Sequence, residues 1–173
     1  MPSVGATINA LLVATKAKGV TTIENAAKEP EIVNVATFLN NMGAKIRGAG
    51  TETITIKGVE HLHKAFHEVI PDRIEAGTYI IIGALLGENL KIKRIIPTHV
   101  ESLTSKLIEA GADMEIKEDE IIINAKDKYK SVNVKTQPYP GFPTDLQQPI
   151  IPFLTRCRGT STVEETIYEN RFQ

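Results

Sequence analysis

The residues of this chain with the clearest capacity for chemistry lie where helices are expected to begin. Ser3-Val4-Gly5-Ala6-Thr7 combines two hydroxyls, a glycine and free backbone amides at a helix start, an arrangement that can hold a phosphate. The same residues also fit an ordinary helix cap, in which Ser3 accepts a hydrogen bond from an amide of the first turn. The string alone therefore indicates either an anion site or a cap.

A second group of polar residues surrounds Asp145, which follows Phe142-Pro143-Thr144. Its carboxylate could act in proton transfer or could cap the next helix, and the residues alone leave both roles open. Further along the chain, Glu169-Asn170-Arg171-Phe172 is a dense polar cluster after a predicted strand. That cluster fits either a binding role or ordinary surface charge.

One structural unit occurs twice in full and starts a third time. Gly19 and Gly87 each follow a predicted helix and lie 68 residues apart, as do Gly43 and Gly111. Gly159 follows Gly87 by 72 residues. A fixed period predicts stacked supersecondary units, none of which buries its apolar face alone.

The repeat aligns three residues of different chemistry at the entrance to the first helix of each unit. They are Gly5, Arg73 and Asp145. Positions that only pack would look alike across the repeats, so a glycine, a cation and a carboxylate indicate functions that differ by unit.

The elements that must position these groups alternate between helix and strand. Helices are predicted over about 6–18, 30–42, 73–86 and 98–110, and strands over 20–24, 45–47, 53–57, 88–92, 120–124 and 160–164. We expect an α/β fold of repeated β-α-β-α-β-β units, with mixed sheets because each unit ends in a hairpin.

Three local features can also be predicted. Thr98 and Glu101 predict a capping box, and the apolar stretch 73–86 predicts a central helix. Pro149 and Pro152 are expected to disturb the helix after Asp145.

Composition limits the partners. The 173 residues carry a net charge of −1 without a long basic run, so neither nucleic acid nor a membrane surface is an expected partner. No apolar run reaches the roughly 18–20 residues of a membrane span, and no signal peptide is recognised, so a cytoplasmic location is expected. Cys157, the single cysteine, is interpreted as a structural thiol. The histidines at 61, 63 and 67 do not favour a zinc site, and neither a metal nor a cofactor is expected.

Several strings in fixed order closely resemble one family over essentially the whole chain. That family is the UDP-N-acetylglucosamine 1-carboxyvinyltransferases, which are enolpyruvyl transferases. The strings are Ser3-Val4-Gly5-Ala6-Thr7, Glu24-Asn25-Ala26-Ala27-Lys28-Glu29-Pro30-Glu31-Ile32-Val33, Gly48-Ala49-Gly50-Thr51, Pro71-Asp72-Arg73-Ile74-Glu75-Ala76-Gly77, Phe142-Pro143-Thr144-Asp145 and Glu169-Asn170-Arg171-Phe172.

The resemblance implies a fold of two lobes, each an inside-out α/β barrel of three repeated units, with the active site between them. It makes residues 1–70 the last unit of one lobe and residues 71–140 a full unit of the second lobe. Residues 141–173 would then be the truncated start of the next unit. The chain is accordingly expected to be an internal fragment of a longer enzyme.

The resemblance also implies a reaction, the transfer of enolpyruvyl from phosphoenolpyruvate to the 3-hydroxyl of UDP-N-acetylglucosamine. This is the first committed step of peptidoglycan synthesis. Asp145 and Arg171 would be catalytic, with Asp145 holding the sugar hydroxyl and Arg171 stabilising the charge of the intermediate. The substrate-binding residues implied are Ser3, Val4, Gly5, Arg73, Thr144, Asp145, Ile167 and Tyr168.

The family's catalytic cysteine and its mobile loop match no part of these 173 residues. We therefore expect this piece to be inactive alone and, because half a lobe leaves apolar faces uncovered, to self-associate. Two alternatives stay open. One is 3-phosphoshikimate 1-carboxyvinyltransferase, which shares the repeat and the chemistry, and the other is a non-catalytic module that binds sugar nucleotides or serves as a scaffold.

Overall fold

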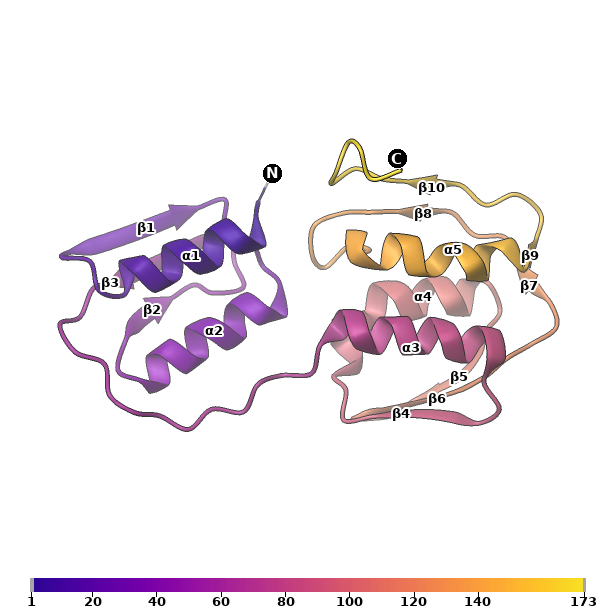
Figure 1. Cartoon of the computed structure of the whole chain (residues 1–173), viewed down its shortest axis with the longest axis horizontal. Helices are drawn as coiled ribbons and strands as arrows, with labels where there is room; N and C mark the ends of the chain where they lie inside the picture. Colours follow the sequence, from indigo (N-terminus) through magenta and orange to yellow (C-terminus); the bar gives the residue numbers. More distant parts are fainter. Residues whose placement is uncertain (1, 173) are drawn as a thin grey trace. The chain divides into compact units, whose positions relative to one another are not determined.

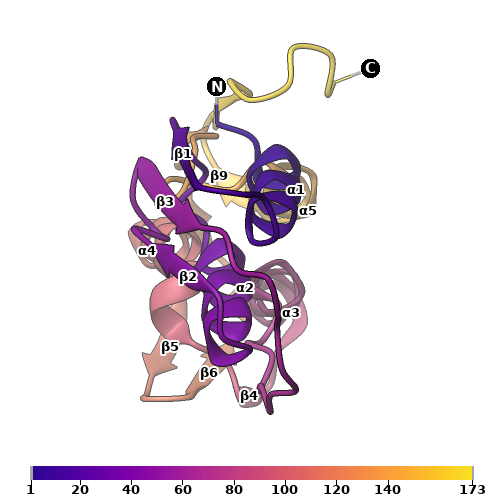
Figure 2. The same ribbon diagram turned by 90° about the vertical axis from the view of Figure 1, so that its left-hand side faces the viewer.

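The computed structural model describes residues 2–172, which form two compact units divided between Ile70 and Pro71. The first unit contains α1 (Val4–Ala14), β1 (Val20–Glu24), α2 (Pro30–Asn41), β2 (Lys45–Arg47) and β3 (Thr53–Lys57). Its sheet has the order β1-β3-β2 with antiparallel neighbours. Figure 2 shows the unit as two layers, with α1 and α2 on one face of the sheet.

Alternation along the strands explains which face of this sheet is covered. In β3 the side chains of Ile54 and Ile56 are buried, while the threonines and the lysine between and beside them are exposed. The two isoleucines pack with Leu11 of α1 and Ile32 of α2 in one apolar core. Pro30 can begin α2 without removing a helical hydrogen bond, because a backbone amide at the first position of a helix has no partner within the helix.

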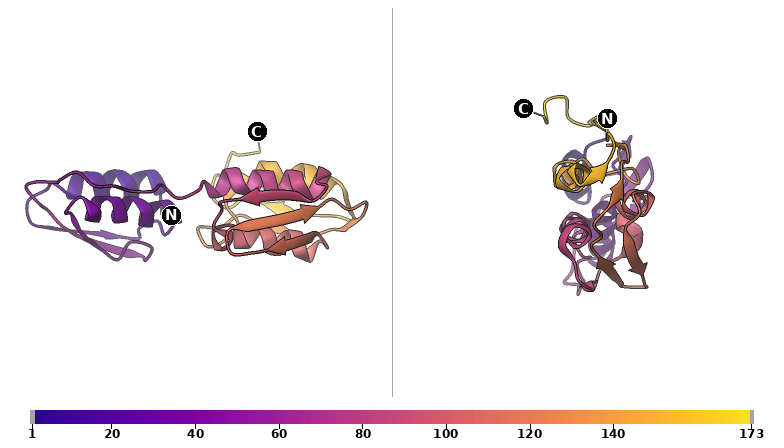
Figure 3. Two further views of the ribbon diagram at one scale, coloured as in Figure 1. Left: turned by 90° about the horizontal axis from the view of Figure 1, so that it is seen from below. Right: turned by 90° about the vertical axis from the view of Figure 1, so that its right-hand side faces the viewer.

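The second unit repeats this arrangement and then extends it. It begins with α3 (Arg73–Leu86), β4 (Leu90–Lys93), η1 (Pro97–Val100), α4 (Glu101–Glu109), β5 (Asp113–Ile116) and β6 (Glu120–Asn124). Its antiparallel sheet has the order β4-β6-β5, which matches β1-β3-β2 of the first unit strand for strand. Figure 3 shows this sheet from below, with its strands running along the length of α3.

The extension supplies parallel pairing. It contains β7 (Tyr129–Lys130), β8 (Val134–Lys135), η2 (Thr144–Leu146), α5 (Gln147–Thr155), β9 (Cys157–Arg158) and β10 (Val163–Glu164). β7 pairs with β9 and β8 pairs with β10, both in parallel. Helix α3 contacts both β6 and α5, and in Figure 1 it lies between the sheet and α5. The predicted α/β fold is therefore confirmed, but the prediction of mixed sheets was wrong: among the described residues the three-stranded sheets are antiparallel throughout and the two-stranded sheets are parallel.

The order of elements is shorter than the β-α-β-α-β-β predicted. Each three-stranded unit runs α-β-α-β-β, and residues 58–72, which precede α3, form no strand. No helix in the described residues is long and apolar enough to cross a membrane.

Three local predictions were wrong. Thr98 and Glu101 form no capping box, because the chain tightens into the 3-10 turn η1, which contains Thr98, before α4 begins. Helix α3 is buried on one side only, since Tyr79 and Leu86 are exposed. Helix α5 forms despite its prolines: Pro149 lies in the first turn, where an amide has no helical partner, and only Pro152 is interior.

Candidate active site

The segment that carries Asp145 is fixed by packing against α3. Leu146, the next residue, is buried, and its side chain lies over Gly77 of α3. A Cβ at position 77 would be 2.5 Å from Leu146 Cδ1, so any larger residue there would force the buried Leu146 side chain to shift. Asp145 itself is exposed and makes no side-chain cap at the start of α5. The cap interpretation of Asp145 was therefore wrong, and its carboxylate is available for other contacts.

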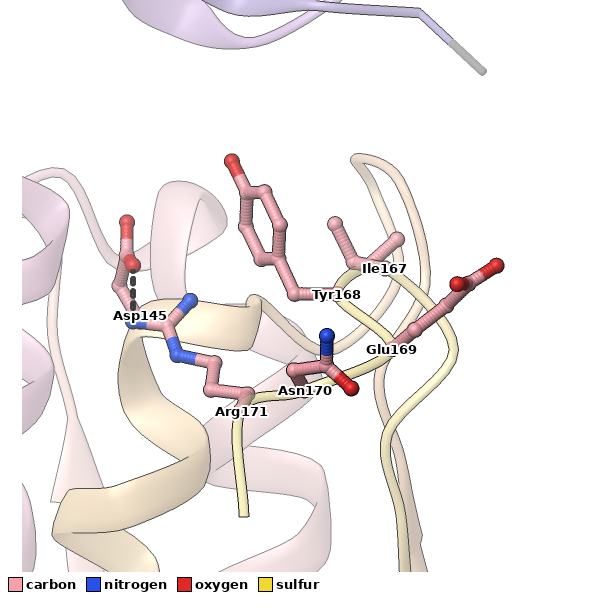
Figure 4. Close-up of a pocket in the computed structure, with 6 residues that line it drawn as sticks. All are labelled: Asp145, Ile167, Tyr168, Glu169, Asn170 and Arg171. Carbon is pink, nitrogen blue, oxygen red and sulfur yellow. Dashed lines mark hydrogen bonds and ion pairs between the residues drawn. The ribbon is translucent and has the colours of Figure 1, made fainter. Parts of the chain in front are cut away.

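Arg171 joins this segment from the far end of the chain. Its Nη2 lies 2.7 Å from Asp145 Oδ1, and its Nη1 donates to the Thr144 hydroxyl at 2.7 Å. Figure 4 shows the Asp145–Arg171 bond and the second carboxylate oxygen pointing away from the guanidinium. The arginine side chain is mostly covered, with 24% exposed, whereas 58% of the aspartate side chain is exposed. The pair thus presents a partly solvated carboxylate beside a fixed cation.

An open pocket of about 720 Å³ lies at this pair. Its walls are Asp145, Ile167, Tyr168, Glu169, Asn170 and Arg171 (Figure 4). Tyr168 stands over one side, with the Arg171 guanidinium carbon 5.4 Å from the centre of its ring. The pocket joins an acid–base group, a cation and an aromatic face, which suits a polar, anionic ligand with a hydroxyl to activate.

The loop 165–168 is organised by the carboxylate of Glu165. Glu165 Oε1 accepts from the amides of Ile167 at 2.7 Å and Tyr168 at 3.1 Å, and from the Thr136 hydroxyl at 2.9 Å. Glu165 Oε2 accepts from the Thr144 hydroxyl at 2.8 Å. Burial opposes the charge, but the hydrogen bonds from Ile167, Thr144, Tyr168 and Thr136 outweigh it and lower the pKa of the Glu165 carboxyl.

A lowered pKa of Glu165 predicts a titration of this loop. Its hydrogen bonds stabilise the loop fully above the ordinary glutamate pKa of about 4.3, and that contribution disappears as pH falls through the lower folded value. We expect the amide proton shifts of Ile167 and Tyr168 to titrate together with a midpoint below about 4.3 in NMR spectra. A midpoint at or above the ordinary value would contradict the bonding described.

Arg73 lies at the first residue of α3 and is not among the residues that line the pocket. Its guanidinium carbon is 5.6 Å from the centre of the Tyr139 ring. Asp72 caps the same helix by accepting from the amides of Ile74 at 2.7 Å and Glu75 at 3.3 Å. The sequence did not predict this cap.

In the first unit, Ser3, Val4 and Gly5 lie at the start of α1. The Ser3 hydroxyl accepts from the Ala6 amide at 3.3 Å, so it does act as a helix cap. Thr7 is buried, and its hydroxyl accepts from the Ala27 amide at 3.0 Å, which ties α1 to the segment before α2. Gly5 is exposed, and no atom lies within 4 Å of the place a Cβ would take. The space beside the Gly5 Cα is therefore open.

The structure brings together Thr144, Asp145, Ile167, Tyr168 and Arg171 from the set suggested by resemblance. Glu165 was missed. The signal available was the alternation along the strand, which puts Glu165 on the same inward side as Val163 and leaves Glu164 exposed. Cys157 is outside this pocket, and burial raises the pKa of its thiol, in keeping with a structural role. The described residues contain no group of three or more metal-binding side chains.

Comparison with known proteins places these features in a family. A family profile described as EPSP synthase (3-phosphoshikimate 1-carboxyvinyltransferase) matches residues 1–173. A protein of Listeria monocytogenes serotype 4b named UDP-N-acetylglucosamine 1-carboxyvinyltransferase 2 is 57% identical over 171 residues. A protein of the same name from Lactiplantibacillus plantarum is 58% identical over 172 residues. In both cases the match covers 99% of this chain and 40% of the relative.

A solved structure shows the same fold. The enolpyruvyl transferase NikO from Streptomyces tendae superposes with a TM-score of 0.87 and 28% sequence identity, over 98% of this chain and 41% of that chain. The predicted enolpyruvyl transferase-like architecture is thereby confirmed. Like the match to the curated relatives, this likeness spans well under half of the longer protein.

Proposed function

Because the chain belongs to the EPSP synthase family of enolpyruvyl transferases, we propose that it forms part of an enzyme that transfers enolpyruvyl to UDP-N-acetylglucosamine. The observation that carries the proposal is the pairing of Asp145 with Arg171 at the mouth of an open pocket. The names of relatives with 57–58% identity support this acceptor, which is a precursor of peptidoglycan. We also propose a cytoplasmic location, where a sugar nucleotide would be available.

The proposed roles follow from the chemistry of the transfer. The 3-hydroxyl oxygen of the sugar bonds to C2 of phosphoenolpyruvate while the C2–C3 double bond takes a proton at C3 from a general acid, which gives a tetrahedral intermediate. A base then removes a proton from C3, the double bond forms again, and phosphate leaves C2 with the electron pair of the C–O bond, which gives the enolpyruvyl ether. The Asp145 carboxylate accepts the hydroxyl proton, and Arg171 stabilises the anionic groups of phosphoenolpyruvate and of the intermediate.

The remaining residues are proposed to hold the sugar nucleotide. The pyrophosphate of UDP would lie at the start of α1, near the backbone amides of Ser3, Val4 and Gly5, where the space beside Gly5 is open. Ile167 would contact the N-acetylglucosamine through its backbone, with Tyr168 beside it and Thr144 supporting Arg171. Arg73 is proposed as a further contributor at the start of α3.

Shikimate 3-phosphate is the rival acceptor, since the family profile is named for the enzyme that uses it. A non-catalytic module for sugar nucleotides is the rival of another class. The Asp145–Arg171 pair favours catalysis over simple binding, because a carboxylate close to the acceptor adds little to affinity for an anion.

A chimera separates these candidates. This chain replaces the matching segment of the Listeria monocytogenes relative, to which it is 57% identical, and phosphate release from phosphoenolpyruvate is measured with each acceptor. We expect release with UDP-N-acetylglucosamine and none with shikimate 3-phosphate, while the chain alone is expected to be inactive. A chimera that unfolds cooperatively, binds UDP-N-acetylglucosamine and releases no phosphate would support the non-catalytic module.

The chain alone is expected to self-associate through α3. Tyr79, Ile82 and Leu86 are exposed and lie on one helix face, with 53%, 41% and 76% of their surfaces accessible. Light scattering should show a molecular mass that rises with concentration, and Ile82→Lys should reduce the rise. Lys91→Gln, at an exposed polar position on β4, is the matched control. A constant monomer mass at high concentration would contradict the expectation.

A further inference from the structure

The carboxylate of Glu165 connects three segments of the chain beside the candidate active site. Its carboxylate binds Thr136 just after β8, Thr144 in η2 and two amides of its own loop, those of Ile167 and Tyr168. These partners span more than 30 residues of sequence. The Thr136 hydroxyl also accepts from the Thr166 amide at 2.8 Å, so the same loop is bonded twice to the residue that follows β8.

The direction of these hydrogen bonds determines how Thr144 meets Arg171. An ionised carboxylate can only accept, so the single hydroxyl proton of Thr144 must point to Glu165 Oε2 at 2.8 Å. The lone pairs of the Thr144 oxygen then face Arg171 Nη1, which donates to it at 2.7 Å. The charge on Glu165 thus makes Thr144 an acceptor for the arginine.

The contacts with Thr144 and Asp145 fix the guanidinium at two points. Nη1 meets Thr144 while Nη2 meets Asp145, its neighbour in sequence, at 2.7 Å. Because both terminal nitrogens are hydrogen-bonded, the planar guanidinium cannot turn about its Nε–Cζ bond without breaking one of these hydrogen bonds. If Thr144 turned its proton toward Arg171, one of these points would be lost and the cation would be held by Asp145 alone.

We propose that Glu165 is a positioning residue that holds Arg171 toward Asp145, acting through the Thr144 hydroxyl and the Ile167 and Tyr168 amides. Glu165 does not line the pocket, so it acts on substrate only through these groups. The positioning follows from the contacts alone, whereas its catalytic consequence rests on the proposed function. The residue also holds the loop that carries Ile167 and Tyr168 against the start of α5.

The test uses the whole 173-residue chain and an isosteric change, Glu165→Gln. Glutamine keeps the shape but has only one oxygen, which the Ile167 and Tyr168 amides require as an acceptor. Its NH2 group therefore faces Thr144 and cannot accept the hydroxyl proton. Glu164→Gln is the matched control, because Glu164 is the exposed neighbour that pairs with Lys135 at 2.8 Å. Thr144→Val is the second variant, since it removes the hydroxyl and leaves the bonds from Glu165 to the loop amides in place.

Two groups of NMR signals are followed in each variant, and thermal unfolding checks that each variant is folded. The Nη–H resonances of Arg171 report whether the guanidinium is held against rotation. The amide protons of Ile167 and Tyr168 report the loop. We expect Glu165→Gln to lose the Arg171 resonances and to shift both amides, Thr144→Val to lose the Arg171 resonances alone, and Glu164→Gln to change neither.

Arg171 resonances that persist in Glu165→Gln would overturn the proposal, as would their loss in Glu164→Gln. The second part of the test measures kcat in the chimera. Glu165→Gln should lower kcat about 10- to 100-fold, whereas Glu164→Gln should leave kcat unchanged. A Glu165→Gln chimera with unchanged kcat would also overturn the positioning role. An inactive unsubstituted chimera would refute the proposed function instead, while the NMR result still decides how Arg171 is held.

Discussion

Asp145→Asn in the chimera is expected to lower the rate of enolpyruvyl transfer by about 100- to 10,000-fold, the range typical of losing a general acid or base. Asparagine keeps the size of the side chain and can still accept a hydrogen bond from Arg171, which lies 2.7 Å from the carboxylate. It cannot take the proton of the sugar hydroxyl. The main effect should therefore fall on kcat, measured by phosphate release, with a small change in the KM for UDP-N-acetylglucosamine.

Asp127→Asn is the control for this variant. Asp127 lies on an exposed turn before β7, so the same loss of charge there should leave the rate within about twofold of the unsubstituted chimera. A folded Asp145→Asn chimera with more than a tenth of the starting rate would show that Asp145 does not transfer the proton.

Arg171→Ala should lower kcat by about 100- to 1,000-fold. Removal of one preorganised hydrogen-bond donor has an effect of this size in other sites that stabilise developing negative charge. Lysine should restore only a small part of this loss, although it restores the charge. A single ammonium cannot reach Thr144 and Asp145 with the two-point geometry of the guanidinium, whose distances are both 2.7 Å.

Arg158→Lys supplies the comparison, because Arg158 is exposed on β9. The lysine variant at 158 should match the unsubstituted chimera, while the lysine variant at 171 stays well below it. Equal rates for Arg171→Lys and the unsubstituted chimera would mean that charge alone matters and that the fixed orientation does not.

Periodicity predicted the elements where local sequence decides them. The strands Val20–Glu24, Lys45–Arg47 and Thr53–Lys57 and the helix Arg73–Leu86 have the bounds that alternation, helical spacing and flanking turn residues indicated. The match of β1-β3-β2 with β4-β6-β5 reflects the 68-residue repeat seen in the glycines. These features depend on contacts between residues close in sequence or on a repeated pattern.

The features that were predicted wrongly or not at all depend on turn geometry, burial and contacts between residues far apart in the sequence. The Thr98–Glu101 box failed because a 3-10 turn placed Thr98 inside the helical segment rather than before it. The helix with Pro152 formed because burial of Ile150 and Phe153 outweighs one lost backbone bond. The partners of Glu165 could not be found from spacing, since Thr136 and Thr144 lie 29 and 21 residues away. Long-range hydrogen bonds of this kind leave no local period.

In the candidate site, too, some residues could be predicted from the sequence and others depend on long-range contacts. Resemblance named Thr144, Asp145, Ile167, Tyr168 and Arg171, and the structure places all five around one pocket and its Arg171 contacts. The carboxylate that orders them carries no recognisable motif. Strand alternation places Glu165 on the inward side, but it does not indicate which groups the carboxylate binds.

The roles proposed for Asp145 and Arg171 are tested most directly by a crystal structure of the chimera with UDP-N-acetylglucosamine and phosphoenolpyruvate bound, using Asp145→Asn to halt turnover. We expect the sugar 3-hydroxyl to lie about 2.6–3.2 Å from the side chain at position 145 and Arg171 to contact the phosphoenolpyruvate anion. A sugar bound away from position 145, with Arg171 contacting neither substrate, would refute both roles.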